Sequence, residues 1–69
     1  MAIPLFGPLY KRYRVQQRKP NTHDWQTIET FGTLKLAQQF AKSIQQKTVL
    51  RHTRILDQVT GNIYEIPSL

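Results

Sequence analysis

Cysteine is absent from the 69 residues of this chain. The absence excludes a disulfide framework and any metal site built from thiolates. A chain of this length removes only about 60% of its unfolded surface from water, so its core is small. Neither disulfides nor a thiolate metal site can compensate for that small core. We expect one small domain that gains stability from an additional strand pairing, from a partner or from homodimer formation.

Acidic residues and histidines are also scarce, with 4 Asp and Glu residues and 2 His residues in the chain. General acid–base catalysis needs two groups whose pKa values are pushed apart in a sheltered cleft, and an 8.1 kDa chain has little room for one. His23 and His52 do not have the spacing of a zinc site. Asp57 is interpreted as a turn residue that bonds its own backbone. We predict a protein that is not an enzyme and holds no metal or cofactor.

Long hydrophobic runs are missing as well. The most apolar segment, residues 1–9, is interrupted by Pro4, Gly7 and Pro8. It lacks the leading positive charge and unbroken apolar run of a secretory signal, and it is far shorter than the roughly 20 residues that span a bilayer. We expect an irregular apolar arm on a cytoplasmic protein. The arm either lies across the domain's own core or docks on another chain through Ile3, Leu5, Phe6 and Leu9.

Residues 10–67 are predicted to form one α+β domain with the order β-β-α-β-β. Apolar and polar residues alternate with a period of two over residues 10–18, and residues 25–30 are rich in β-branched and aromatic side chains. The polar loop between them indicates a hairpin. Residues 50–56 and 62–66 form a second predicted pair of strands, joined by a turn in which Gly61 takes a positive φ angle.

An amphipathic helix is predicted over residues 33–47, with Thr33 as its N-cap. Its apolar stripe consists of Leu34, Ala37, Phe40, Ala41, Ile44 and Thr48. Its polar face consists of Lys35, Gln38, Gln39, Lys42, Gln45 and Gln46. One helix can cover only one face of a four-stranded, mainly antiparallel sheet. The other face must therefore be solvated or bound to a partner.

The positive charge is concentrated at the start of this domain. Half of the 10 Lys and Arg residues lie within residues 11–19, where no acid is present. If Tyr13 and Val15 point toward the helix, the alternation places Arg12, Arg14 and Arg18 on the uncovered face. For the second hairpin two assignments are open, because either Arg54 and His52 or Arg51 and Thr53 share that face.

Nucleic-acid binding is the leading functional hypothesis. A net charge of +6 and a pI near 10.2 favour an anionic partner such as nucleic acid or an anionic membrane surface, although such a charge can also serve only to keep a protein soluble. Arginine contacts phosphate bidentately and stacks on bases. The candidate contact residues are Lys11, Arg12, Arg14, Arg18, Lys19, Trp25 and Arg54.

The form of the nucleic acid is left open by the sequence. Tyr10, Trp25 and Tyr64 could stack on the bases of a single strand, with core packing as the alternative role of Trp25. Arg12 and Gln16 could instead read base edges from a strand pair inserted in the major groove of a duplex.

The alternative function is a protein-interaction module, such as a small inhibitor or assembly factor. Such a module would dock on an acidic protein partner or on a second copy of the chain through the arm, the uncovered sheet face or an edge strand. An origin in a phage or plasmid would fit this alternative.

Overall fold

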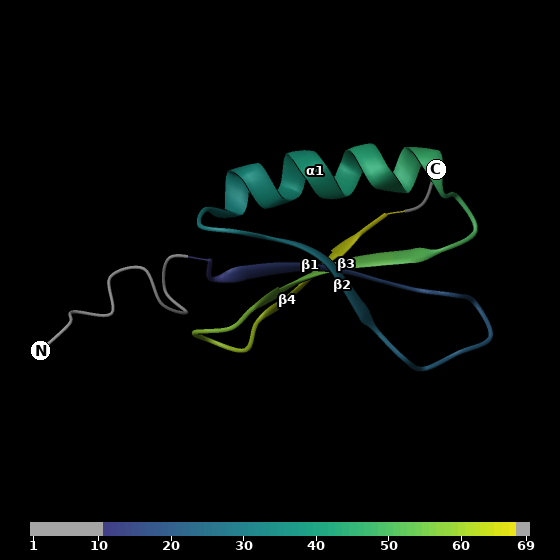
Figure 1. Cartoon of the computed structure of the whole chain (residues 1–69), viewed down its shortest axis with the longest axis horizontal. Coiled ribbons are helices and arrows are strands. Elements are labelled where there is room, and N and C mark those ends of the chain that lie inside the picture. The colour runs from purple at the N-terminus through teal and green to yellow at the C-terminus, as the bar shows by residue number, and fades with distance from the viewer. Residues whose placement is uncertain (1–10, 68–69) are drawn as a thin grey trace, which may run out of the picture.

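The computed structural model describes residues 11–67 and contains one sheet and one helix, shown in Figure 1. The elements along the chain are β1 (Tyr13–Arg18), β2 (Gln26–Phe31), α1 (Leu34–Lys47), β3 (His52–Asp57) and β4 (Ile63–Ile66). The strands lie in the order β2-β1-β3-β4, and each neighbouring pair is antiparallel. The predicted α+β class and the β-β-α-β-β order are confirmed.

The chain crosses the sheet once, between β2 and β3. Because β1 lies between these two strands, α1 passes over the sheet and covers one of its faces (Figure 1). The opposite face carries no helix or strand from residues 11–67. We call it the open face.

The core lies between α1 and the two central strands. Val15 of β1, Ile55 of β3 and Ala37 and Ala41 of α1 are completely buried. The two alanines have small side chains, so the helix backbone can lie close to the sheet. Partly buried hydrophobic residues surround this centre: Tyr13, Phe31, Leu34, Phe40, Ile44, Tyr64 and Ile66. Five of the six residues of the predicted apolar stripe therefore lie in the core, and the sixth, Thr48, is the C-cap of the helix.

The boundaries of α1 follow from local hydrogen bonds. Thr33 is the N-cap, as predicted, and its side chain accepts a hydrogen bond of 3.3 Å from the amide of Leu36. At the other end, the amide of Arg51 donates to the carbonyl of Thr48 at 2.9 Å and closes a turn. This turn keeps Leu50 out of β3, where the sequence had placed it, and Leu50 is 79% exposed.

Polar side chains close the core at the C-terminal end of α1. Gln17 donates from Nε2 to the hydroxyls of Thr48 and Thr53, at 2.8 and 3.1 Å. Gln45 was predicted on the polar helix face, which is wrong, because only 2% of its surface is exposed. It lies one turn after Ala41 on the face toward the sheet. There it donates from Nε2 to the carbonyl of Arg51 at 3.0 Å, which satisfies a backbone acceptor in the turn.

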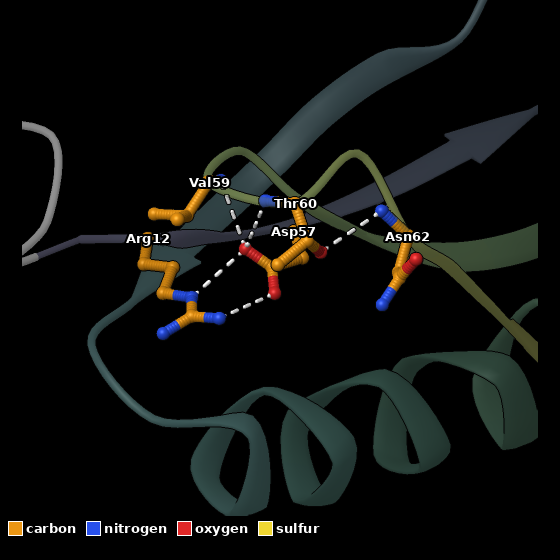
Figure 2. Close-up of polar contacts among 5 residues, drawn as sticks. All are labelled: Arg12, Asp57, Val59, Thr60 and Asn62. Atoms are coloured by element: carbon orange, nitrogen blue, oxygen red, sulfur yellow. Dashed lines mark hydrogen bonds and ion pairs between the residues drawn. The ribbon is translucent and has the colours of Figure 1, made fainter.

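Asp57 closes the opposite end of the core, and Figure 2 shows its contacts. Its Oδ1 accepts hydrogen bonds from the amides of Val59 and Thr60 at 2.9 and 3.4 Å, so it is the predicted turn residue. Arg12 donates from Nε to Oδ1 and from Nη2 to Oδ2, each at 2.8 Å. Gly61 completes the turn with the predicted positive φ of 81°.

The ion pair makes stability depend on pH. The bidentate Arg12 guanidinium holds the pKa of Asp57 well below its usual range, although burial of the carboxylate opposes the shift. A carboxylate with a lowered pKa in the folded state stabilises the protein fully above the pKa of the unfolded chain, about 4. This contribution is lost as the pH falls from there through the folded-state pKa.

We predict that Asp57→Asn lowers the melting temperature at pH 7 by roughly 5 °C or more, because a buried partner of Arg12 and of the turn amides is lost. The variant should also lose less stability than the wild type between about pH 4 and pH 2. Circular dichroism melts at several pH values measure both effects. Asp24→Asn, at an exposed loop acid, is the matched control and should melt like the wild type. Parallel pH curves for all three proteins would contradict the assigned role of the ion pair.

Candidate nucleic-acid interface

Three rows of side chains cross the open face, because directly paired residues of neighbouring strands point to the same side of a sheet. The row nearest the β3–β4 turn consists of Thr30, Arg14, Leu56 and Ile63. The middle row consists of Thr27, Gln16, Arg54 and Glu65. The third row contains Arg18 and His52. Of the two alternatives left by the sequence, the structure therefore places Arg54 and His52 on the open face.

Arg18 and Arg54 both pack against the indole of Trp25. The guanidinium carbon of Arg54 lies 4.1 Å from the ring centroid, and that of Arg18 lies 5.2 Å from it. Both distances are within the range of cation–π attraction. We call these three residues the arginine–tryptophan cluster. Trp25 is half-buried in it and does not belong to the core.

Hydrogen bonds fix the two arginines of the cluster in position. Arg54 donates from Nε to Oε1 of Gln16 at 2.8 Å, and Arg18 donates from Nη1 to the carbonyl of Thr22 at 3.0 Å. Each guanidinium keeps further N–H donors beyond the bond named here. The cluster therefore holds two oriented cations with donor groups to spare.

The charges of the cluster are not neutralised within the described chain. Burial lowers the pKa of Arg54, and the neighbouring Arg18 lowers it further, while Glu65 acts in the opposite direction. Arg54 nevertheless stays protonated near neutral pH, because an arginine pKa lies far above 7. Among residues 11–67, the one ion pair joins Arg12 to Asp57. An added anion between Arg18 and Arg54 would relieve their repulsion.

Two hollows lie beside Arg18. One has a volume of about 300 Å³ and is lined by Arg18, Trp25, His52, Thr53, Glu65 and Ile66. The other has a volume of about 160 Å³ and is lined by Gln17, Arg18, Lys19, Thr22, Asp24, Gln26 and Arg51. Arg18 therefore borders both hollows, at the end of the sheet opposite the Asp57 turn. Lys19 and Arg51 add positive charge to the smaller hollow, and each hollow also has one acidic residue in its lining, Glu65 or Asp24.

The five basic residues of the segment 11–19 lie in three different places. Arg14 and Arg18 lie on the open face as expected, and Lys11 and Lys19 are exposed at the two ends of β1. Arg12 does not lie there. Asp57 is on the same face as Ile55, beneath α1, and Arg12 reaches across to it (Figure 2). The sequence could not show this contact, because the two residues are 45 positions apart.

Most side chains that were predicted to contact bases instead contact other residues of the protein. Tyr64 pairs with Ile55 and packs against the core, so its expected place on the open face is wrong. Gln16 is buried, and both ends of its amide are used, since Oε1 accepts from Arg54 and Nε2 donates to Thr27 at 3.3 Å. Gln16 and Arg12 are thus unavailable as readers of duplex base edges. Tyr10 lies outside the described residues.

The proposed docking residues of the arm, Ile3, Leu5, Phe6 and Leu9, also lie outside the described residues. The sequence analysis also did not place two apolar residues, Leu56 and Ile63, on the open face. Leu56 and Ile63 lie opposite each other beside Arg14. Their orientation was hardly indicated by the sequence, because each has an apolar neighbour, Ile55 or Tyr64. The alternation of apolar and polar residues therefore did not decide which side chain of each pair is buried.

We predict that Arg54→Ala moves the fluorescence emission of Trp25 to longer wavelength, since removing the guanidinium exposes the indole to water. Trp25 is the one tryptophan of the chain, so its emission is read without interference from another. Arg14→Ala is the control, because it removes a cation from the same face and Arg14 is not one of the two arginines that pack on the indole. The emission spectrum of the Arg14→Ala variant should match that of the wild type. Equal shifts in both variants, or none in Arg54→Ala, would show that Arg54 does not cover the ring.

Within the described part of the chain, no helix is long and apolar enough to cross a membrane, and no group of three or more metal-ligating residues is found. Comparisons with protein-family models, with curated proteins and with solved structures gave no match to this chain.

Proposed function

We propose that this protein binds the phosphate backbone of nucleic acid through its open face and has no catalytic role. The observation that supports the proposal is the set of three arginines on one face, Arg14, Arg18 and Arg54, that form no ion pair within residues 11–67. Guanidinium groups contact phosphate oxygens bidentately. Each contact also releases counterions from the nucleic acid, which favours binding at low salt.

The arrangement of the cluster favours a binding role over simple solubility. Charges that only keep a protein soluble need no fixed position and are best spread apart. Arg18 and Arg54 are instead partly buried, packed on one indole and held by hydrogen bonds despite their mutual repulsion. This arrangement favours binding of an anion. The donors are already oriented, so less conformational entropy is lost when the ligand binds.

Lysines extend the positive surface along the same strand. β1 is an inner strand of the sheet, and Lys11 and Lys19 are exposed at its two ends. With Arg14 and Arg18 between them, cations follow the whole length of β1. A nucleic-acid backbone lying along this strand would meet positive charge throughout.

The exposed face of α1 is the competing surface. It carries Lys35 and Lys42, both exposed, on the side of the molecule away from the open face. Among the described residues, neither lysine packs on an indole and neither is held by a side-chain hydrogen bond, although Lys42 borders a hollow of about 210 Å³. They therefore provide a control with equal charge and a different position.

We predict that Arg14→Glu combined with Arg18→Glu lowers affinity for a labelled oligonucleotide at least about 30-fold at 50 mM salt, because two phosphate contacts become repulsive. Lys35→Glu combined with Lys42→Glu changes the net charge equally and should lower affinity by less than about threefold. Fluorescence anisotropy measures binding, and thermal melts verify that each variant is folded. For the wild type, three phosphate contacts give a slope of about −2 to −3 for log affinity against log salt.

Two outcomes would contradict the proposal. If the wild type binds neither a single strand nor a duplex at 50 mM salt, the protein does not bind nucleic acid. If the lysine variant loses as much affinity as the arginine variant, binding depends on total charge or on the α1 surface, and the open face has no special role.

A further inference from the structure

The open face has an aliphatic part beside its arginines. In the row nearest the β3–β4 turn, Arg14 lies opposite Leu56, and Leu56 lies opposite Ile63 on β4. Ile63 is 43% exposed, and Leu56 is half-buried. No element of residues 11–67 covers this pair. The face thus joins a cationic part, which follows β1 and the middle of β3, to an aliphatic part on β3 and β4.

A nucleic-acid duplex does not complement a face that is partly cationic and partly aliphatic. Its bases are stacked inside, and its outer surface is the charged sugar–phosphate backbone. Leu56 and Ile63 would then lie against phosphates, where burial of apolar surface yields no gain. Insertion into the major groove needs side chains that read base edges, and the two expected readers, Arg12 and Gln16, are held by Asp57 and by Arg54.

A single strand of nucleic acid exposes both phosphates and apolar base surfaces, which complement the two parts of this face. Its phosphates are accessible on one side, and its unpaired bases expose apolar faces on the other. Trp25 is not a free stacking platform, because Arg54 lies over its ring at 4.1 Å. The apolar surface that remains on the open face for a base is the pair Leu56 and Ile63.

Glu65 determines which way such a strand would lie. It is exposed on β4 in the middle row, opposite Arg54 and two residues after Ile63. Its carboxylate repels phosphates from the β4 side, whereas Arg14 and Arg18 attract them to β1. Phosphates along β1 leave the bases pointing across the sheet toward Leu56 and Ile63.

We propose that the open face takes single-stranded nucleic acid, with phosphates at Arg14, Arg18 and Arg54 and with bases packed on Leu56 and Ile63. This inference rests on the proposed function and specifies its ligand. The site is short, since Arg14 and Arg18 are four residues apart on one strand, a distance of about 13 Å. It spans a few nucleotides.

Three ligands of equal length test the inference: a single-stranded oligonucleotide, its blunt duplex, and an abasic strand that keeps the sugar–phosphate backbone alone. We expect the full chain to bind the single strand about tenfold more tightly than the duplex at the same salt concentration. Ile63→Thr should weaken binding to the base-containing strand about fivefold, because apolar contact with a base is lost. The same variant should bind the abasic strand as the wild type does, since its phosphate contacts are intact.

Val49→Thr is the matched control, because Val49 is a 55% exposed aliphatic residue in the connection between α1 and β3. It should leave binding to all three ligands unchanged. Threonine suits position 63 because its branched side chain is compatible with a strand, and at position 49 it replaces another β-branched residue. Thermal melts verify folding of each variant.

The inference fails if the duplex binds as tightly as the single strand, or if Ile63→Thr weakens binding to the abasic strand as much as to the base-containing one. In either case binding to nucleic acid remains, and the proposed function stands. If the wild type binds none of the three ligands, the proposed function itself fails. A dimer in sedimentation that Ile63→Thr converts to a monomer, and Val49→Thr does not, would assign the aliphatic pair to a second copy and overturn the inference.

Discussion

A sheet has two faces, and the described chain supplies one helix to cover one of them. This constraint determines how the side chains of every strand are used. Residues beneath α1 form the core around Val15 and Ile55, whereas their neighbours in the sequence point to the open face. The same alternation that buries Val15 therefore exposes Arg14 on the other side of β1. Core and candidate site are two results of one periodic pattern.

The small core explains the importance of polar contacts at its ends. Four residues are completely buried hydrophobics, and two of them are alanines. Gln17 and Gln45 satisfy hydroxyl and carbonyl groups at one end, and Arg12 binds Asp57 at the other. The Arg12–Asp57 pair has a second consequence, because it holds the Arg12 guanidinium on the side of the sheet that α1 covers. The guanidinium groups left for the open face are therefore those of Arg14, Arg18 and Arg54.

Local patterns predicted much of the fold, and contacts distant in the sequence account for what they missed. The period of α1, its cap at Thr33 and the positive φ at Gly61 depend on neighbouring residues, and all three predictions are confirmed. Arg12 was misplaced because its partner Asp57 belongs to another hairpin, and Gln45 was misplaced because a carbonyl of the α1–β3 turn needs its amide. Which face Leu56 and Ile63 occupy depends on the pairing of β3 with β1, which no local pattern reveals. The contact of Arg54 with Trp25 follows from the same pairing.

The account depends on binding at the open face, and a titration followed by NMR tests this directly. The ¹⁵N-labelled full chain is titrated with a short single-stranded oligonucleotide, and the Nε–Hε signals of the arginine side chains are followed with the backbone amides. The account predicts that the signals of Arg14, Arg18 and Arg54 shift together, while that of Arg12 and the amides of α1 hardly move. Shifts concentrated on α1 around Lys35 and Lys42, with the three arginine signals unchanged, would contradict it.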